Sequence, residues 1–384
     1  MKNTVDVFWR FLLLGCISFG GPAAHIGYFH KAFVEKLQWL DDRQFAQLLS
    51  LSQFLPGPGS SQLGFSIGLH RAGLLGGIAA FIGFTLPSFI ILYLVATLSL
   101  DLNSATDMGR LFNGAIHGFK LLAVVVVADA CIGMYKKFCM TKLSASLAVF
   151  TALALWLAPS FMTQIGVLIF AAIIGICWGN KAAEIQQQPG KLAIAPLLIF
   201  IALFALLPLF ASSHQTVDLL SQFYHSGSLV FGGGHVVLPL LQQLLGDSVS
   251  TDRFLLGYAS AQAIPGPMFS FATFLGAELM QDQTLLGASL ATIGIFLPGF
   301  LLVLALRDAW QSWLSRPRVQ GAVWGVNAAV VGLLIAALYQ PVFVSAVQGI
   351  HDVALIAVGL LALLVFRLPI LYLVLGFALC GMVL

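Results

Sequence analysis

Clusters of glycine and proline interrupt the apolar segments of this chain at matching places in its two halves. In the first half Phe19-Gly20-Gly21-Pro22 precedes Leu55-Pro56-Gly57-Pro58, and in the second half Phe231-Gly232-Gly233-Gly234 precedes Ile264-Pro265-Gly266-Pro267. Helix-breaking residues at corresponding positions in two halves are the best sequence indication of the binding site of a secondary transporter. The pattern therefore favours a solute carrier.

The Pro-Gly-Pro break of the first half has the chemistry of an anion site. Pro56 and Pro58 withdraw backbone donors and end one helix, while Gly57 lets the chain reorganise. A new helix is then expected to begin at Ser60-Ser61-Gln62. The first N–H groups of a helix lack intrahelical partners and carry about half a positive charge. A tetrahedral anion binds readily at such a helix start.

The second half repeats the arrangement, with Pro265-Gly266-Pro267 before a helix that has Ser270 in its first turn. The two glycine clusters supply two further helix starts, and four starts sum to about two positive charges, which matches a dianion. A buried arginine would cost about 3 kcal/mol, whereas a helix start brings its charge with the folded backbone. Irregular backbone at membrane depth needs surrounding protein or water, so the breaks predict a cavity. The alternative is that they only kink the helices for packing.

Polar side chains beside the breaks complete the predicted oxoanion site. His25 and His235 each follow a glycine cluster, where an imidazole either donates to an oxoanion or makes an interfacial hydrogen bond. Gln53 and Gln262 lie three residues before their Pro-Gly-Pro motifs and offer amide donors without a charge. The predicted substrate-binding set is Gly20, Gly21, His25, Gln53, Pro56, Gly57, Pro58, Ser60, Ser61, Gln62, Gly232, Gly233, Gly234, His235, Gln262, Pro265, Gly266, Pro267 and Ser270.

Three charged residues fall inside apolar segments, where a charge is a functional hypothesis by default. They are Arg10, Lys120 and Asp129. Asp129 could carry a coupling proton, and Arg10 and Lys120 either serve the site or snorkel to an interface. Asp129 follows Lys120 by about 14 Å along one helix, so these two cannot pair directly. Asp42 and Asp252 fit the N-caps of the helices that end at the Pro-Gly-Pro breaks.

The composition identifies the solvent as a lipid bilayer. Hydrophobic residues make up 59% of the 384 residues and charged residues 9%, and segments such as 285–306 are long enough to cross the hydrocarbon core. The first apolar stretch, 5–19, lacks a cleavage pattern and is expected to stay in the mature protein. The five cysteines form no metal-binding pattern and are interpreted as packing residues. A net charge of +3 gives no argument for nucleic acid binding.

The apolar runs predict an all-α polytopic membrane protein with about thirteen transmembrane helices. Residues 1–190 form a first repeat of six spans, 191–212 a linker span, and 213–384 a second repeat of six. An odd linker helix makes the second repeat enter the membrane from the opposite side, which is an inverted-topology repeat with broken helices. The expected spans are 5–21, 44–70, 73–99, 110–135, 143–159, 162–179, 192–210, 217–231, 254–280, 285–306, 319–340, 350–366 and 369–384.

The distribution of basic residues predicts the orientation. Most Lys and Arg residues fall in loops on the side of the N-terminus, which the positive-inside rule makes cytoplasmic. The opposite side holds Lys31, Lys36, Arg43 and Arg110, two of them in an amphipathic stretch, His25 to Leu40, that suits the membrane interface. The expected N-terminus is cytoplasmic and the expected C-terminus periplasmic.

The repeat extends beyond the glycines, and in this it resembles the chromate ion transporter family, long-chain two-domain type. Leu86-Pro87 corresponds to Leu297-Pro298, and each half has a Phe-Gly-Gly start and a later Pro-Gly-Pro. The resemblance covers essentially the whole chain. It implies an all-helical carrier of the inner membrane that exports chromate and confers resistance, with sulfate as the usual analogue. One departure is Gly234, which stands where the first half has Pro22.

The leading hypothesis is therefore an alternating-access carrier for chromate. Its expected partners are the oxoanion and membrane lipid, and no cofactor is expected. Uptake or exchange of sulfate is the close alternative, because size and charge barely distinguish the two anions. An anion channel would share the helix-end chemistry but needs a continuous pore. A membrane-embedded enzyme would need a nucleophile, metal cluster or paired carboxylates, and the sequence shows none; it shows no Walker motif for ATP either. Fusion of two halves permits a complete site in one chain and a homodimer as well.

Overall fold

The computed structural model describes residues 2–19, 21–98, 107–178, 191–211, 214–230, 237–310 and 316–383, and within them it is helical throughout, with no strand. Five stretches are long and apolar enough to cross a membrane: Gly59–Leu98, Gly114–Phe138, Ile194–Ala211, Gln281–Leu306 and Pro317–Ala346. These helices agree with a polytopic membrane protein. Cys16, Cys131, Cys139, Cys177 and Cys380 are all free thiols.

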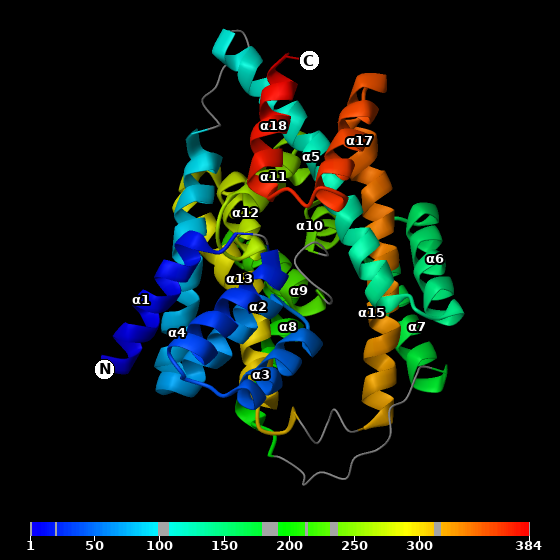
Figure 1. The fold of residues 1–384 in the computed structure, drawn as a ribbon. Coiled ribbons are helices and arrows are strands. Elements are labelled where there is room, and N and C mark those ends of the chain that lie inside the picture. The colour runs from blue at the N-terminus through cyan, green and yellow to red at the C-terminus, as the bar shows by residue number, and fades with distance from the viewer. Residues whose placement is uncertain are drawn as a thin grey trace. The chain divides into compact units, whose positions relative to one another are not determined.

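The helices of the first half begin with α1 (Figure 1). In chain order they are α1 (Lys2–Ile17), α2 (Gly21–Phe29), the π-helix η1 (His30–Lys36), α3 (Asp42–Phe54), α4 (Gly59–Leu98), α5 (Asp107–Phe138), α6 (Lys142–Leu157) and α7 (Phe161–Trp178). Helix α4 is two helices joined at a sharp turn, because Ala72 and Gly73 leave helical geometry.

After α8 (Ile194–Ala211), the second half follows nearly the same order of helices. These are α9 (Gln215–Leu229), α10 (Val237–Leu245), η3 (Gly246–Ser248), α11 (Thr251–Ala263), η4 (Met268–Ser270), α12 (Phe271–Leu279), η5 (Gln281–Gln283), α13 (Thr284–Leu306), α15 (Pro317–Ala337), η6 (Leu338–Phe343), α16 (Val344–Ala346), α17 (Ile350–Leu364) and α18 (Ile370–Val383). Both Pro-Gly-Pro motifs lie between two helices, α3 and α4 in one half and α11 and η4–α12 in the other. The expected spans 44–70 and 254–280 are therefore each broken, as the sequence predicts.

The chain forms two compact units, and each unit draws on both halves. The first unit contains Met1–Asp101, Ala193–Val237 and Ser260–Arg307; the second contains Leu102–Leu192, Leu238–Ala259 and Asp308–Leu384. The division of the sequence into repeats at 1–190 and 213–384 thus differs from the division by packing, and it stays a prediction. Both Pro-Gly-Pro breaks lie in the first unit.

Small residues let the helices of the first unit approach closely. Helix α1 packs against α4 and α9 against α13, while α12 and α13 pack on each other and on α4 (Figure 1). A Cβ on Gly68 would lie 2.3 Å from the carbonyl oxygen of Gly76, and one on Gly276 would lie 2.3 Å from that of Gly287. Each half therefore has a helical hairpin directly after its Pro-Gly-Pro break, closed at a Gly-Gly contact.

The second unit is built around α5 and α15. Helix α5 packs against α15, α17 and α18, and α15 packs against α6 and α7. The crossings again rest on glycine, since a Cβ on Gly118 would meet the carbonyl oxygen of Phe377 at 1.9 Å, and one on Gly175 would meet that of Gly321 at 2.0 Å.

Candidate functional site

The first-half break is a sharp turn between two helices. Helix α3 ends at Phe54, Leu55 is extended, and α4 begins at Gly59. Gly57 has a φ of +116°, a conformation that is essentially restricted to glycine. The carbonyl oxygen of Ser52 lies 3.0 Å from the place that a Cβ on Gly59 would take, so the chain turns back on itself. The predicted helix break and helix start are both confirmed.

Residues from the second half complete this turn. The backbone N–H of Gly57 donates to the carbonyl of Val230, directly after α9, at 2.7 Å. A Cβ on Gly57 would lie 3.0 Å from Nε2 of Gln62 and 3.2 Å from Cα of Gly299, on α13. The Gln62 amide donates from Nε2 to the carbonyl of Pro56 at 2.8 Å and to that of Gly299 at 3.3 Å. The fully buried Gln62 side chain therefore joins the break to α13.

The second-half break has the reciprocal arrangement. Gly266 has a φ of +110°, and its N–H donates to the carbonyl of Ser18, directly after α1, at 3.0 Å. A Cβ on Gly266 would lie 2.9 Å from Oγ of Ser88, on α4. Ser88 donates to the carbonyl of Thr85 at 2.9 Å and accepts from Ser270, with the two hydroxyl oxygens 2.7 Å apart. Each break therefore contacts two parts of the other half: the residue that follows its first helix, α9 or α1, and a later helix, α13 or α4.

His25 links the two breaks. Its ring is fully buried, with Nε2 3.2 Å from the carbonyl of Ser18 and Nδ1 3.2 Å from Oγ of Ser60. Because a carbonyl can only accept, Nε2 carries a proton and donates to Ser18. In a neutral ring Nδ1 then accepts a hydrogen bond from the Ser60 hydroxyl. The edge of Phe84 meets the ring at 5.1 Å. His25 therefore positions Ser60 and Ser18 and has no donor left over for a substrate in this arrangement.

The start of α4 has unused donors. The N–H of Gln62 bonds to the carbonyl of Pro58 at 2.9 Å, whereas those of Gly59, Ser60 and Ser61 have no acceptor among the described residues. The Ser61 hydroxyl is buried and has no partner there either. Unpartnered polar atoms are rare in protein interiors and call for a water, ion or ligand. Further such atoms in the same unit are Oγ of Ser18, Oγ1 of Thr85 and Oε1 of Gln62.

The other predicted site residues stay predictions. Gln53 is exposed, and Gln262 donates to the thioether of Met268 at 3.4 Å, across its own break. Gly21 begins α2 with a φ of +73°. The remaining predictions lie outside the described residues: Gly20, Gly232, Gly233, Gly234 and His235.

The three charges that the sequence places inside apolar segments lie in different surroundings. Arg10 pairs with Asp6 one turn earlier on α1 at 3.2 Å, and both side chains are exposed. Lys120 is buried and forms an ion pair with Asp252 of α11. Asp129 is half-buried on α5. The role of these charges in coupling stays a prediction.

Two predicted helix caps are wrong. Asp41, not Asp42, is the N-cap of α3. Its carboxylate accepts from the backbone N–H of Gln44 at 2.7 Å, and the side-chain oxygen of Gln44 accepts from the backbone N–H of Asp41 at 3.0 Å. Asp42 bonds to His30 instead, and Asp252 pairs with Lys120 from the first turn of α11. Asp41 and Asp42 are adjacent, and the sequence alone does not show which of the two caps the helix.

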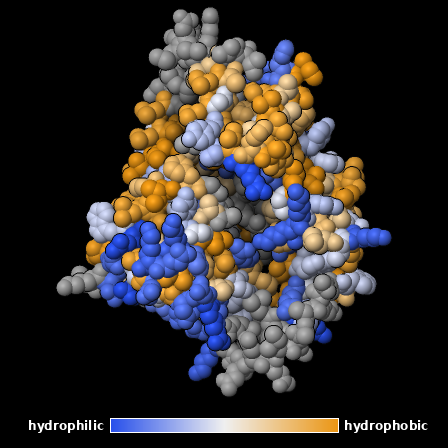
Figure 2. Space-filling view, viewed as in Figure 1, coloured by the Kyte–Doolittle hydropathy of each residue, from blue (hydrophilic) through white to orange (hydrophobic). Residues whose placement is uncertain are grey.

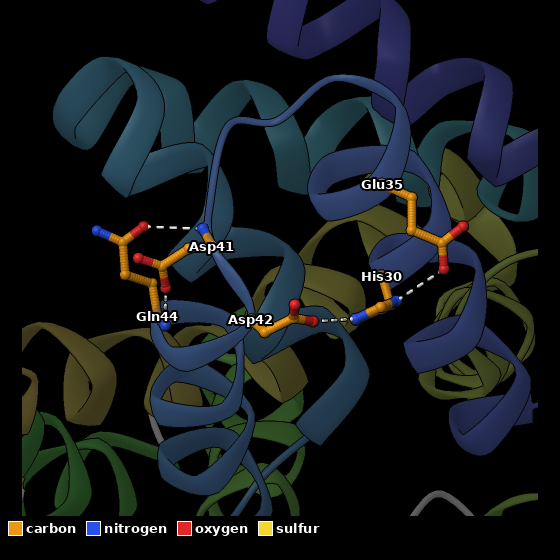
Figure 3. Close-up of polar contacts among 5 residues, drawn as sticks. All are labelled: His30, Glu35, Asp41, Asp42 and Gln44. Carbon is orange, nitrogen blue, oxygen red and sulfur yellow. Dashed lines mark hydrogen bonds and ion pairs between the residues drawn. The ribbon is translucent and has the colours of Figure 1, made fainter.

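Polar side chains of η1 and of the start of α3 contact one another (Figure 3). Nε2 of His30 lies 2.8 Å from Asp42, and Nδ1 lies 3.2 Å from Glu35. The hydrogen bond to Asp42, aided by Glu35, raises the pKa of His30. Figure 2 shows hydrophilic side chains gathered over this region of the surface, which suits an interface with water.

Sequence reasoning missed Ser18, Thr85, Ser88 and Gly299. Ser88 and Gly299 directly follow the paired prolines Pro87 and Pro298, so the repeat itself contained a signal for them. Among the described residues, no group of three His, Cys, Asp or Glu side chains is placed to hold a metal ion.

Comparisons with known proteins agree with the family resemblance seen in the sequence. The chromate transporter family model matches the chain twice, over residues 5–176 and 217–382. A chromate transport protein of Cupriavidus metallidurans is 30% identical over 371 residues, covering 92% of this chain and 86% of the relative. One from Pseudomonas aeruginosa is 27% identical, covering 86% of this chain and 79% of the relative. A probable chromate transport protein of Synechococcus elongatus is 29% identical, covering 92% and 87%. No solved structure matches significantly.

Proposed function

This chain belongs to the chromate transporter family, and we propose that it is a secondary transporter that exports chromate by alternating access. The substrate site is the start of α4 together with the two Pro-Gly-Pro breaks. The protein lies in the inner membrane with a cytoplasmic N-terminus and a periplasmic C-terminus. Its thirteen spans form two inverted repeats, with one linker helix between them.

The observation that carries the proposal is the set of unused donors at α4. Three first-turn N–H groups and the Ser61 hydroxyl have no partner among the described residues, although Ser60 and Ser61 are buried. The dipole of α4 adds about half a positive charge there. Donors of this kind suit an oxoanion and cost no buried cationic side chain.

The reciprocal bonding of the breaks suits a moving site. Gly57 bonds to Val230 and Gly266 to Ser18, so a movement of α1 or α9 changes the break of the other half. Ser60 and Ser61 at the start of α4 are buried, which supports entry of the substrate by such a movement. We propose that one of these two contacts breaks when the site opens to one side of the membrane, and the other breaks when it opens to the opposite side.

The driving force need not be a coupled ion. The membrane potential favours expulsion of an anion from a negative interior by about 2.3 kcal/mol per charge per 100 mV. Asp129, Lys120 and Arg10 are the residues proposed to couple a proton or balance charge, if a pH gradient contributes.

Sulfate uptake or exchange is the second candidate, because the α4 donors fit any tetrahedral oxoanion. A channel is disfavoured by the buried donors, which a continuous pore would expose to water. Radiolabelled chromate and sulfate flux in proteoliposomes, with the imposed potential and the pH gradient varied separately, tests the proposal. We expect saturable chromate flux with counterflow. Non-saturating flux without counterflow would indicate a channel, and sulfate flux without chromate flux would overturn the proposed substrate.

A further inference from the structure

The amide of Gln62 has a fixed orientation. Pro56 and Gly299 both present carbonyl oxygens to it, at 2.8 and 3.3 Å, and two acceptors require the NH2 end to face them. The side chain has no exposed surface and fills the place that a Cβ on Gly57 would need. Rotating the amide would set its oxygen against two carbonyl oxygens. The orientation is therefore dictated by the break itself.

This orientation leaves the amide oxygen without a donor. Oε1 of Gln62 is buried and has no partner among the described residues. A buried acceptor without a hydrogen bond is costly, because it has lost its bonds to water. The same first turn of α4 carries the unpartnered Ser61 hydroxyl and the free N–H groups. The site therefore offers several donors and one acceptor that itself needs a donor.

A fully ionised tetrahedral oxoanion has only acceptor atoms, so it satisfies the donors and repels Oε1. An oxoanion that keeps one proton has three acceptor oxygens and one O–H donor. We propose that the site at the start of α4 selects the singly protonated form of its oxoanion, with the O–H donating to Oε1 of Gln62. This inference rests on the proposed function and specifies its substrate.

The charges at the two breaks agree with a singly charged substrate. The second-half helix starts with the short 3-10 turn η4, and the Ser270 N–H already bonds to the carbonyl of Pro267 at 2.9 Å. The Ser270 hydroxyl is engaged by Ser88. The second-half start therefore has fewer free donors than the start of α4, which suits a singly charged substrate. The residue at the Gln62 position of the second half is Phe271, so only one half supplies the acceptor.

Selection of the singly protonated form would let the site discriminate chromate from sulfate. Chromate takes up a proton near neutral pH, whereas sulfate does so only in strong acid, although the two dianions share one shape and charge. Near neutral pH a site that favours the O–H binds the protonated fraction of the chromate more tightly, whereas sulfate is available almost entirely as the more weakly bound dianion. The discrimination therefore comes from protonation rather than from size.

The test measures the KM for chromate and the inhibition constant of sulfate in proteoliposomes with equal pH on both sides. The pH spans the range in which chromate takes up its proton. For the wild type, we expect the chromate KM to rise as pH rises. Sulfate stays the dianion throughout this range and binds weakly without the O–H contact, so its inhibition constant should stay level. The groups against the Gln62 amide are backbone carbonyls, and the nearest titratable side chain of the network is His25, through Ser60. Its titration would affect sulfate as well, so sulfate is the internal control.

The variant Gln62→Met keeps the length of the side chain and removes Oε1. We expect it to lower the preference for chromate over sulfate about tenfold, the factor that one hydrogen bond to a charged partner carries, and to flatten the pH dependence of the KM. Gln222→Met, on α9, where the amide donates to Asp218 at 2.9 Å, is the matched control and should keep both values.

The outcomes separate this inference from the proposed function. An unchanged chromate-to-sulfate preference in a folded Gln62→Met protein overturns the inference alone, provided that Ser61→Ala weakens both anions. Absence of saturable chromate flux in the wild type overturns the proposed function. If Gln62→Met does not fold, the wild type decides: a chromate KM that is constant over this pH range overturns the inference.

Discussion

The backbone N–H of Gly57 donates to the carbonyl of Val230 at 2.7 Å, across the boundary between the two halves of the sequence. The bond from Gly266 to Ser18, at 3.0 Å, is its counterpart. Both glycines have a φ above +100°, so neither break can be built from another residue without strain. Each break is therefore held by a backbone bond to the other half of the sequence.

Alanine at Gly57 or Gly266 should reduce chromate transport at least tenfold. The added Cβ would lie 3.0 Å from Nε2 of Gln62 or 2.9 Å from Oγ of Ser88, and the positive φ costs about 1–3 kcal/mol. Initial flux in proteoliposomes measures this, normalised to folded protein. Gly133→Ala is the control, because a Cβ there meets nothing within 4 Å. Full flux in Gly57→Ala would remove the break from the mechanism.

Ser61→Ala should raise the KM for chromate about tenfold and leave the maximal rate nearly unchanged. The hydroxyl is the unpartnered side-chain donor at the start of α4, and a hydrogen bond to a charged group contributes about 1.5–3 kcal/mol. Substrate-dependence curves give both constants. Ser289→Ala, whose hydroxyl only bonds the carbonyl of Leu285 on α13, serves as the control. Equal constants for Ser61→Ala and wild type would exclude a contact with the anion.

The stability contributed by His30 should depend on pH. The Asp42 carboxylate raises the pKa of His30 above its unfolded value, so this stabilisation is fully present below the unfolded pKa and is lost as pH rises through the folded pKa. Melting temperatures of wild type and His30→Gln should therefore differ more in mildly acidic than in alkaline buffer. A difference that grows toward alkaline pH would contradict this sign.

Asp252→Asn should destabilise the protein more than Asp6→Asn. The first change leaves the buried Lys120 ammonium without its carboxylate, at a cost of about 1–3 kcal/mol, whereas the Arg10–Asp6 pair is exposed and contributes little. Thermal unfolding in one detergent compares the two variants directly. Equal melting temperatures would show that the Lys120 pair contributes no more than a surface pair.

The broken helices could be predicted because proline and glycine act locally. Pro56, Gly57 and Pro58 end one helix and permit another whatever surrounds them, and the observed start at Gly59 follows. The repeat pattern also predicted that the second half breaks in the same way at Gly266. The family was accessible too, since the matched motifs cover the whole chain.

The partners of the breaks could not be predicted, because they come from distant parts of the sequence. Nothing local shows that Gly57 bonds to Val230 or that Gln62 contacts Gly299. Gln53 and Gln262 were placed only by their spacing from the break. Gln53 is exposed and Gln262 donates to Met268, and their membership of the site stays a prediction.

The most direct test of the account is the position of the bound anion. Crystals of the protein grown with chromate, measured for the anomalous signal of chromium, locate it without assumptions about transport. We expect a peak about 4 Å from Oγ of Ser61 and from the first N–H groups of α4, the spacing of a metal atom whose oxygens accept hydrogen bonds of about 3 Å. A peak in the second compact unit, with none at the start of α4, would contradict the account.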